Sequence, residues 1–537
     1  MVTLRIEDYA LIGDLQTCAL VARDGSIDWM CIPRFDSPAC FAALLGTPDH
    51  GRWKLAPRDA VLAVERRYRD DTLILETTFT TESGRVRVVD FMPIRTEAID
   101  VMRIVEGVEG RVAMRMDFSI RFDYGSIVPW VRATESGIRA IAGPDTVYLR
   151  SDVPLHGENY TTVADFDVAA GERVVFDLTW TESHHPHPPR EDPCEALIHL
   201  EQFWRDWSSR CTYEGKWRDA VMRSLITLKA LTYAPTGGIV AAATTSLPEQ
   251  IGGVRNWDYR LCWLRDATFS IYALLGGGYT EEAIAWREWL VRAAAGLPEE
   301  LQIMYSIRGE RHLTELEIAW LPGYENSKPV RVGNAAFTQY QLDVYGEVMD
   351  MLHITRKLDL PPSEDAWRVQ CALMRFLESG WKEPDEGIWE VRGPRRHFTH
   401  SKVMAWVAFD RAVAAVEKFG LDGPVEQWRA IREEIRAEIM ERGFRADLNA
   451  FTQFYGSPHA DASLLMLPAL GFIDSDDPRM TGTIALIRAQ LETNGLLHRY
   501  PTEPSIDGLP PGEGAFLLCT FWLADTLALA GNYEEAE

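Results

Sequence analysis

The sequence predicts a multidomain α and β protein in which an antiparallel β-sandwich precedes a larger all-helical domain. Short runs of alternating apolar and polar residues fill the first third of the chain, whereas apolar residues recur at helical spacing beyond it. A stretch rich in proline and histidine separates the two parts. We therefore expect a sandwich domain at 1–190, a linker with a helix at 191–214 and a helical domain at 215–537.

The strongest strand signal surrounds Asp24-Gly25, a turn dipeptide between two alternating runs, which predicts a hairpin over 19–31. Further strands are expected at 67–80, 84–91, 101–108, 111–120, 137–142, 146–150 and 172–179. Many short strands with hardly a helical period among them are typical of an antiparallel sandwich.

The separating stretch, 181–194, reads TESHHPHPPREDPC. Its histidines could bind a metal, but histidines between prolines in a polar stretch are more often part of a linker, so we predict no metal site. Helices are expected at 195–207, 217–233, 264–275, 281–295, 337–358, 364–379, 400–419, 424–442, 460–470, 480–493 and 515–529. Such a domain is either a solenoid or a closed toroid of paired helices, and the lack of a fixed repeat disfavours the solenoid.

The amino-acid composition limits the classes of molecule that the protein can bind. The chain has 55 Lys and Arg against 80 Asp and Glu, a formal net charge of −25 in 537 residues, so we expect neither nucleic acid nor a membrane surface as partner. No run approaches the roughly 18 apolar residues of a membrane helix, and the first ten residues lack the layout of a signal peptide.

The eight cysteines form no CxxC pair and fit reduced core residues of a cytoplasmic protein. The assembly state stays open between a monomer and a homo-oligomer.

Functional groups concentrate in the loops between helices. The segment 250–266, QIGGVRNWDYRLCWLRD, places Trp257, Asp258, Arg265 and Asp266 directly before an apolar helix. Aromatic rings stack on the apolar face of a sugar, and Arg and Asp side chains can clamp its hydroxyls. The alternative is that Asp266 only caps the helix, which would not explain the aromatic residues.

Three further loops carry candidate groups. Glu325 and Arg331, in the loop 320–334, either contact a substrate or form a surface ion pair. Glu390 lies between Trp389 and Val391, where loss of water would raise the pKa of its carboxyl as a general acid requires, unless it is an exposed strand residue. Glu513 lies between glycines before a helix, so it either approaches a ligand or interacts with the helix dipole.

Six motifs in order carry a resemblance to a known family. They are IEDYALIGD, DGSIDWMCIPRFDSPACFAALLG, NWDYRLCWLRDATF, LPGYENSKPVRVGNAA, GIWEVRG with HFTHSKVMAWVAFDRA, and DGLPPGEGAFLLCTFWLADTLA. The chain resembles the inverting α-glycosidase family of glucoamylases, glucodextranases and bacterial or archaeal trehalases. The resemblance implies an N-terminal super-β-sandwich, an (α/α)6 barrel, and hydrolysis of α-glucosides without a metal or organic cofactor.

The resemblance also implies roles for individual residues. Arg265 and Asp266 match the pair that grips the non-reducing glucose, and Trp389 and Glu390 match the motif of the general acid. Val391 stands where glucoamylases commonly have a second acidic residue.

The general base is harder to place. The glucoamylase-type position reads Leu497-His498-Arg499-Tyr500 and contains no acid, so the GEGAF segment assigns the base to Glu513, with Glu503 as the fallback.

These departures from the glucoamylase pattern, with the cytoplasmic expectation, predict trehalose as the substrate, cleaved with inversion to two glucose molecules. Glucoamylase-type or isomaltoside-type hydrolysis is the runner-up. Two other classes stay open: a sugar phosphorylase, in which Lys328 and Arg331 would gather at a phosphate site, and a non-catalytic glucan-binding protein.

Overall fold

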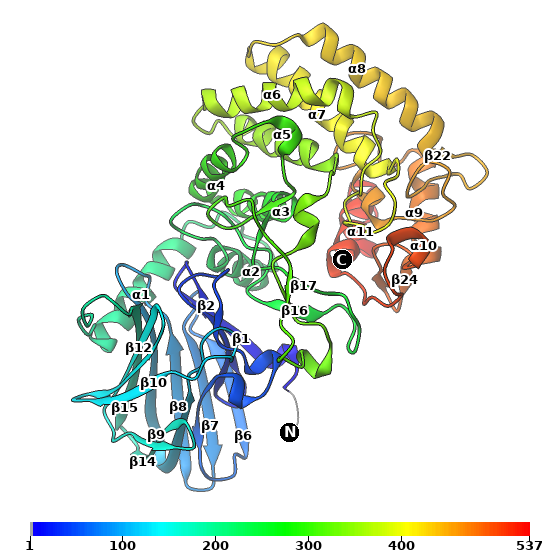
Figure 1. Cartoon of the computed structure of the whole chain (residues 1–537). Helices are drawn as coiled ribbons and strands as arrows, with labels where there is room; N and C mark the ends of the chain where they lie inside the picture. The colour runs from blue at the N-terminus through cyan, green and yellow to red at the C-terminus, as the bar shows by residue number, and fades with distance from the viewer. Residues whose placement is uncertain (1–3) are drawn as a thin grey trace.

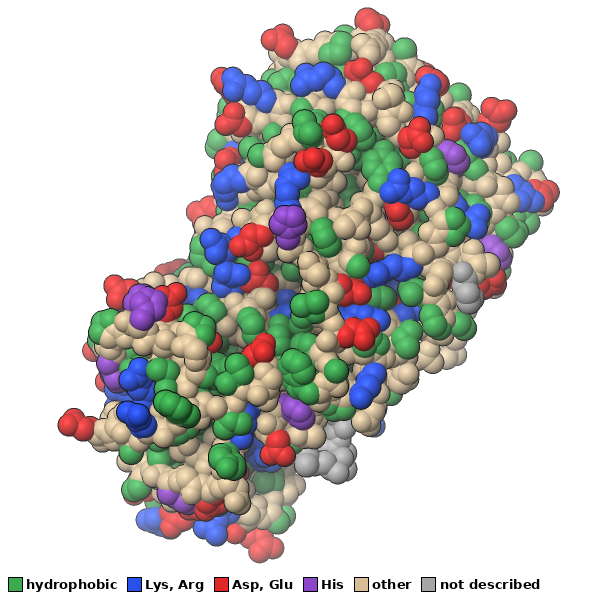
Figure 2. Space-filling model, viewed as in Figure 1, with side chains coloured by type: hydrophobic (Ala, Val, Ile, Leu, Met, Phe, Trp, Pro, Cys, Tyr) green, Lys and Arg blue, Asp and Glu red, His purple; other side chains and the backbone are tan. Residues whose placement is uncertain are grey.

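The computed structural model describes residues 4–537 and places a sandwich of antiparallel strands beside a larger helical domain (Figure 1). The predicted order, with the strands first and the helices after them, is confirmed. On the face drawn in Figure 2, acidic and basic side chains are interspersed over both domains. Among the helices of residues 4–537, none combines the length and the apolar character needed to cross a bilayer.

The sandwich has two layers. One layer contains β1 (Tyr9–Gly13), β2 (Cys18–Ala22), β3 (Ser26–Cys31), β4 (Ala39–Phe41), β5 (Arg52–Pro57), β13 (His156–Glu158) and β14 (Thr161–Ala169). The other contains β6 (Ala63–Tyr68), β7 (Leu75–Thr81), β8 (Gly84–Phe91), β10 (Trp130–Thr134), β11 (Gly137–Ala142), β12 (Asp145–Ser151) and β15 (Arg173–Glu182). The predicted hairpin corresponds to β2 and β3, whereas β1, β4, β5, β10, β13 and β14 were not predicted. The strand expected at 67–80 is instead the end of β6 and most of β7, with a turn between them.

One long strand, β9 (Ile99–Ser119), belongs to both layers. Its first half pairs with β8 and β15, and its second half pairs with β5 and β14. The prediction of two separate strands, 101–108 and 111–120, is therefore wrong. Gly110, at a φ of 66°, lies where the strand passes from one layer to the other.

The helical domain follows from 193 onward. Its main helices are α1 (Pro193–Ser208), α2 (Arg218–Ala230), α3 (Leu264–Gly276), α4 (Thr280–Ala293), α5 (Asp343–Lys357), α6 (Glu364–Gly380), α7 (Thr399–Phe419), α8 (Val425–Glu438), α9 (Pro478–Leu491) and α11 (Leu517–Leu529). Helix α3 contacts α5, and α5 contacts α7. A 3-10 segment, η8 (Ala462–Met466), then joins α7 to α11, and the rings of Phe269 and Trp522 join α11 to α3. Closure into six helix pairs stays a prediction.

Three predicted helices differ from the observed ones. The expected helix at 460–470 is only η8, because the Asp461 side chain accepts a hydrogen bond from the Ser463 amide and Pro468 cannot continue a helix. The helix expected from 337 begins at Asp343, after a 3-10 turn capped by Asn334. The helix expected to end at 442 changes to a π-helical turn after Glu438.

The two domains are joined by buried aromatic and ionic contacts. Trp29 of β3, a buried residue of the sandwich, donates from its indole Nε1 to the Ala243 carbonyl of the helical domain at 2.8 Å. The buried Arg260 guanidinium donates to the Ser37 carbonyl of the sandwich at 2.8 Å and pairs with Asp258 at 2.7 Å. The junction therefore places the loop before α3 firmly against the sandwich. The domain limits at 190 and 214 stay predictions.

Candidate active site

A cavity of about 380 Å³ lies where the loops before α3, α7 and α11 meet. Five of the predicted site residues line it: Trp257, Arg265, Asp266, Trp389 and Glu390. Glu513, the predicted base, lines it as well. Segments separated by more than a hundred residues in the sequence therefore contribute to one concave site.

Arg265 and Asp266 occupy the first turn of α3. The Arg265 guanidinium lies 3.2 Å from Asp266 Oδ2 and donates to the Ile388 carbonyl of the loop that carries Glu390. The N-cap residue of α3 is Trp263, so the alternative in which Asp266 only caps the helix is wrong. Asp266 Oδ2 has no hydrogen-bond partner among the described residues, which leaves it available to a ligand hydroxyl.

Glu390 is held through one of its two carboxyl oxygens. Trp263 Nε1 donates to Glu390 Oε1 at 2.7 Å, and Arg265 lies 3.4 Å from the same oxygen. Burial raises the pKa of the Glu390 carboxyl, and this effect exceeds the lowering by Arg265 and Trp263. The residue has a φ of 57°, an uncommon conformation for a side chain larger than glycine, and such strain clusters at functional sites.

Glu513 is also held through one oxygen. The Arg499 guanidinium donates to Glu513 Oε1, whereas no described residue hydrogen-bonds to the buried Oε2, which lies 4.0 Å from Arg255. The first turn of α11 contains no acidic residue, so the helix-dipole alternative is wrong. The φ of 121° at Gly512 suits only glycine, which explains one of the two flanking glycines.

The sequence analysis missed Glu249, a further carboxylate of the cavity. Its Oε2 lies 3.0 Å from the same Arg499 that pairs with Glu513, and burial raises the pKa of its carboxyl. The guanidinium of Arg499 also lies over the rings of Trp389 and Phe516. Glu249 and Arg499 are 250 positions apart in the sequence, so no local pattern could predict this pair.

A second missed pair anchors the loop that carries Glu513. Arg255 Nη2 donates to Asp507 Oδ2 at 2.6 Å and to the Pro510 carbonyl at 3.0 Å. Tyr500 donates to the same Asp507 oxygen at 3.1 Å. The buried Asp507 thereby fixes the chain a few residues before Glu513.

The indole of Trp257 lies between two guanidinium groups. Arg331 lies 4.6 Å and Arg392 lies 4.8 Å from its ring centroid. Arg392 lines the cavity, whereas Arg331 donates to the carbonyls of Val254 and Asn256 behind it. Trp257 is thus a fixed aromatic wall of the cavity.

The remaining candidates lie outside the cavity. Asp258 is buried against Arg260 and accepts from the Gly333 amide at 2.9 Å, so it supports the domain junction. Glu325, Lys328 and Glu503 are exposed. The suggested ion pair between Glu325 and Arg331 is wrong, because Arg331 instead faces Glu315 at 3.6 Å and Glu317 at 3.9 Å.

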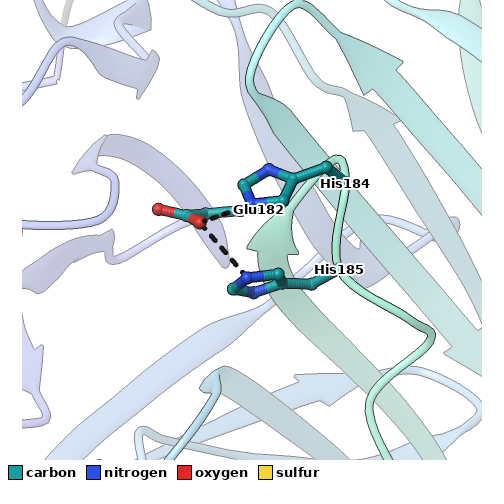
Figure 3. Close-up of side chains that lie close together, drawn as sticks. All are labelled: Glu182, His184 and His185. Carbon is teal, nitrogen blue, oxygen red and sulfur yellow. Dashed lines mark ion pairs between the residues drawn. The ribbon is translucent and has the colours of Figure 1, made fainter.

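One group in residues 4–537 brings together three potential metal ligands: Glu182, His184 and His185 (Figure 3). His184 Nε2 and His185 Nε2 lie 3.4 and 3.5 Å from Glu182 Oε2. All three side chains are exposed at the end of β15, in the stretch predicted as a linker, and none lines the cavity.

Comparisons with known proteins agree on one family. The family described as "Glycosyl hydrolases family 15" matches residues 215–536, and "Trehalase-like, N-terminal" matches residues 2–194. The chain is 36% identical to a trehalase of Mycobacterium tuberculosis, over 99% of this chain and 82% of that protein. It is 35% identical to a trehalase of Thermoplasma volcanium, over 99% and 86%. The chain belongs to glycosyl hydrolases family 15.

As a member of family 15, the chain is a glycoside hydrolase, as predicted. A bacterial glucoamylase complexed with acarbose shares its fold with a TM-score of 0.73 at 14% identity, covering 100% of this chain and 88% of that one. A putative kojibiose phosphorylase matches with a TM-score of 0.50 at 10% identity, over 98% and 81%. At these identities the likeness concerns the fold alone, so the hydrolase class follows from the family.

Proposed function

We propose that this family 15 hydrolase cleaves α,α-trehalose into two glucose molecules by a single displacement with inversion. One observation carries the proposal: two buried carboxyl groups line one cavity, and each has one oxygen held by a neighbour and the other without a described partner. That arrangement suits a general acid and a general base acting on opposite faces of one sugar.

Glu390 is the proposed general acid. Burial raises its pKa, which favours the protonated form, and because Oε1 already accepts from Trp263, the proton is assigned to Oε2. This proton passes to the glycosidic oxygen as the bond to the anomeric carbon breaks, so the leaving glucose departs as a neutral alcohol.

Glu513 is the proposed general base. Its Oε1 is held by Arg499, and its Oε2, which has no described partner, accepts a proton from the water that attacks the anomeric carbon. In an inverting enzyme the two carboxyl groups lie roughly 6.5–9.5 Å apart to leave room for this water. The fallback base, Glu503, is exposed and outside the cavity, which favours Glu513.

The glucose that reacts is proposed to lie against Trp257, with its hydroxyls held by Arg265 and Asp266. These groups line the cavity beside Glu390, with Arg265 3.4 Å from its carboxyl, and the proposed action is exo, on one terminal unit. The chemistry as proposed uses water and two carboxyl groups, with no metal or organic cofactor.

Trehalose is the proposed substrate for two reasons. The relatives named trehalases match over nearly the whole chain, and Val391 replaces an acidic residue that glucoamylases commonly have. A volume of about 380 Å³ is also near the lower end for ligand sites, which favours a disaccharide over a long glucan. We also propose a cytoplasmic site of action, supported by eight free cysteines.

The direct test compares trehalose, maltose, isomaltose and soluble starch, with glucose release and its first anomeric form followed by NMR. We expect the highest kcat/KM for trehalose and equal initial amounts of α- and β-glucose, because inversion changes only the attacked sugar. If maltose or isomaltose exceeds trehalose by tenfold, about 1.4 kcal/mol, the substrate is wrong while the hydrolase assignment stands. Strict dependence on phosphate with formation of glucose 1-phosphate would instead identify a phosphorylase.

A further inference from the structure

A second cavity of about 700 Å³ lies in the helical domain behind the first. Phe269, Leu518 and Trp522 line both cavities. The ring centroids of Phe269 and Trp522 are 5.8 Å apart, so these two side chains form a wall between the two spaces. The second cavity is thus separate from the proposed catalytic groups.

A buried carboxyl group faces this cavity without a partner. Glu347 of α5 lines the cavity and is 4% exposed, yet none of the described residues gives it a hydrogen bond or an ion pair. An unsatisfied polar group in such a place is costly and calls for an explanation. Burial raises the pKa of the Glu347 carboxyl and so favours its protonated form, which can both donate and accept a hydrogen bond.

The cavity also offers aromatic surface. Phe521 of α11 lines the cavity and is 65% exposed, next to the shared Trp522. Of the polar groups in the lining, Asp350 is already engaged, since it accepts from Arg411 at 2.6 Å and from the Tyr272 hydroxyl. The cavity therefore combines a ring surface with a fixed ion pair and two carboxyl groups that have no partner among the described residues, the buried Glu347 and the exposed Asp525.

The charges of the lining restrict the class of ligand. A cationic ligand would be repelled by three basic residues of the lining, Arg411, Lys357 and Lys418. An anionic ligand would be repelled by three acidic ones, Asp350, Asp410 and Asp525. A purely apolar ligand would leave Glu347 unsatisfied. A molecule with one apolar face and several neutral hydroxyl groups satisfies all of these conditions.

We propose that the second cavity binds a neutral sugar, a glucopyranose unit that stacks on Phe521 and hydrogen-bonds to Glu347. The proposal concerns binding and does not depend on the catalytic assignments above. It also accounts for an exposed aromatic ring and a buried unpaired carboxyl that line the same cavity.

The test measures glucose binding by saturation-transfer NMR. It uses the Arg265→Ala variant, because this substitution weakens glucose binding in the first cavity. We expect saturable binding that Phe521→Ala weakens about tenfold, the size of a lost stacking contact. Leu517→Ala is the matched control, because Leu517 lies on the same helix, is similarly exposed and lines neither cavity. No saturable binding, or equal binding in both variants, overturns the proposal.

Glu347→Leu supplies a second readout. We expect loss of glucose binding with an equal or higher Tm, because the substitution removes a buried carboxyl that has no partner. Retained binding would overturn the assignment of Glu347. A large drop in Tm would show that its carboxyl serves the fold, and would overturn it as well. Tighter binding of glucose 6-phosphate than of glucose would overturn a neutral ligand.

Discussion

At the scale of residues, the two proposed catalytic carboxyls differ in their neighbours. Glu390 accepts a hydrogen bond from the uncharged Trp263 indole and lies 3.4 Å from Arg265. Burial therefore has the largest effect on the pKa of its carboxyl. Glu513 shares Arg499 with Glu249. Environments that differ in this way separate an acid from a base in one site.

The first prediction concerns the acid. Glu390→Gln should lower kcat for trehalose by about 10²- to 10⁴-fold, because the leaving alkoxide loses its proton donor. α-Glucosyl fluoride, whose leaving group needs little protonation, should lose much less. Steady-state kinetics on both substrates decide the matter, and equal losses would contradict the assignment.

The second prediction concerns the pH profile. The hydrogen bond from Trp263 lowers the pKa of the Glu390 carboxyl, so Trp263→Phe should raise that pKa further. Activity needs protonated Glu390 and falls as the pH rises through its pKa. The alkaline limb of kcat/KM should therefore move up by as much as about one pH unit. An unchanged limb would mean that another group controls it.

The third prediction separates the two candidate bases. Glu513→Gln should lower kcat by about 10²- to 10⁴-fold, since the attacking water loses its proton acceptor. Glu503→Gln is the matched variant on the same loop, and it should stay within about twofold of wild type because Glu503 is exposed. The reverse ranking would move the base to Glu503.

At the scale of elements, strand β9 buries charged groups in two ways. Arg103 is compensated by Asp90 at 2.7 Å and by the carbonyls of Trp53 and Gly25. Asp100 accepts only from the Thr179 hydroxyl, and burial raises the pKa of its carboxyl to about 7. One strand thus carries a compensated ion and a carboxyl whose protonated form the fold favours.

The fourth prediction follows from Asp100. Because its folded-state pKa is raised, its contribution to stability is full below about pH 4 and is lost as the pH rises to about 7. Asp100→Asn does not titrate, so its stability relative to wild type should grow by about 1–3 kcal/mol between these pH values. Urea unfolding across this range measures the difference. The exposed Glu109→Gln on the same strand should show no such trend.

The sequence predicts elements well where the pattern is local. The expected strands 84–91 and 137–142 coincide with β8 and β11, because alternation and flanking turns define them alone. It fails where distant contacts decide: the runs 101–108 and 111–120 predict two separate strands, and only pairing with strands far along the chain makes β9 continuous. The apolar run at 460–470 resembles a helix, but local side-chain bonds and Pro468 prevent one.

At the scale of the whole molecule, the segment WDYR, residues 257–260, helps to join the two domains. Its acidic residue, Asp258, serves this junction and does not line the cavity. The guanidinium of Arg260 lies among groups of the sandwich, including the Ser37 carbonyl, the Cys31 sulfur and the Tyr124 ring. Composition could indicate a sugar site in this segment, but not which of its charged residues face the cavity. Partners such as Ser37 are more than two hundred positions away.

The fifth prediction tests this junction. Arg260→Met leaves Asp258 buried without its partner, which should cost about 3–5 kcal/mol and lower the Tm in calorimetry. We expect the unfolding transition to broaden or divide as the domains lose this contact. Adding Asp258→Asn should restore part of the loss, because no unpaired charge then remains. A Tm equal to that of wild type would contradict a structural role for the pair.

The shared strand β9 also bears on how the gene can be cut and rejoined. A break within Ile99–Ser119 would take pairing partners from both layers at once, so fragments divided there have no intact sheet to reassemble on. The mostly exposed stretch between β15 and α1 belongs to no strand of either layer, which makes it a better place than β9 for an inserted reporter or a split into two complementing halves.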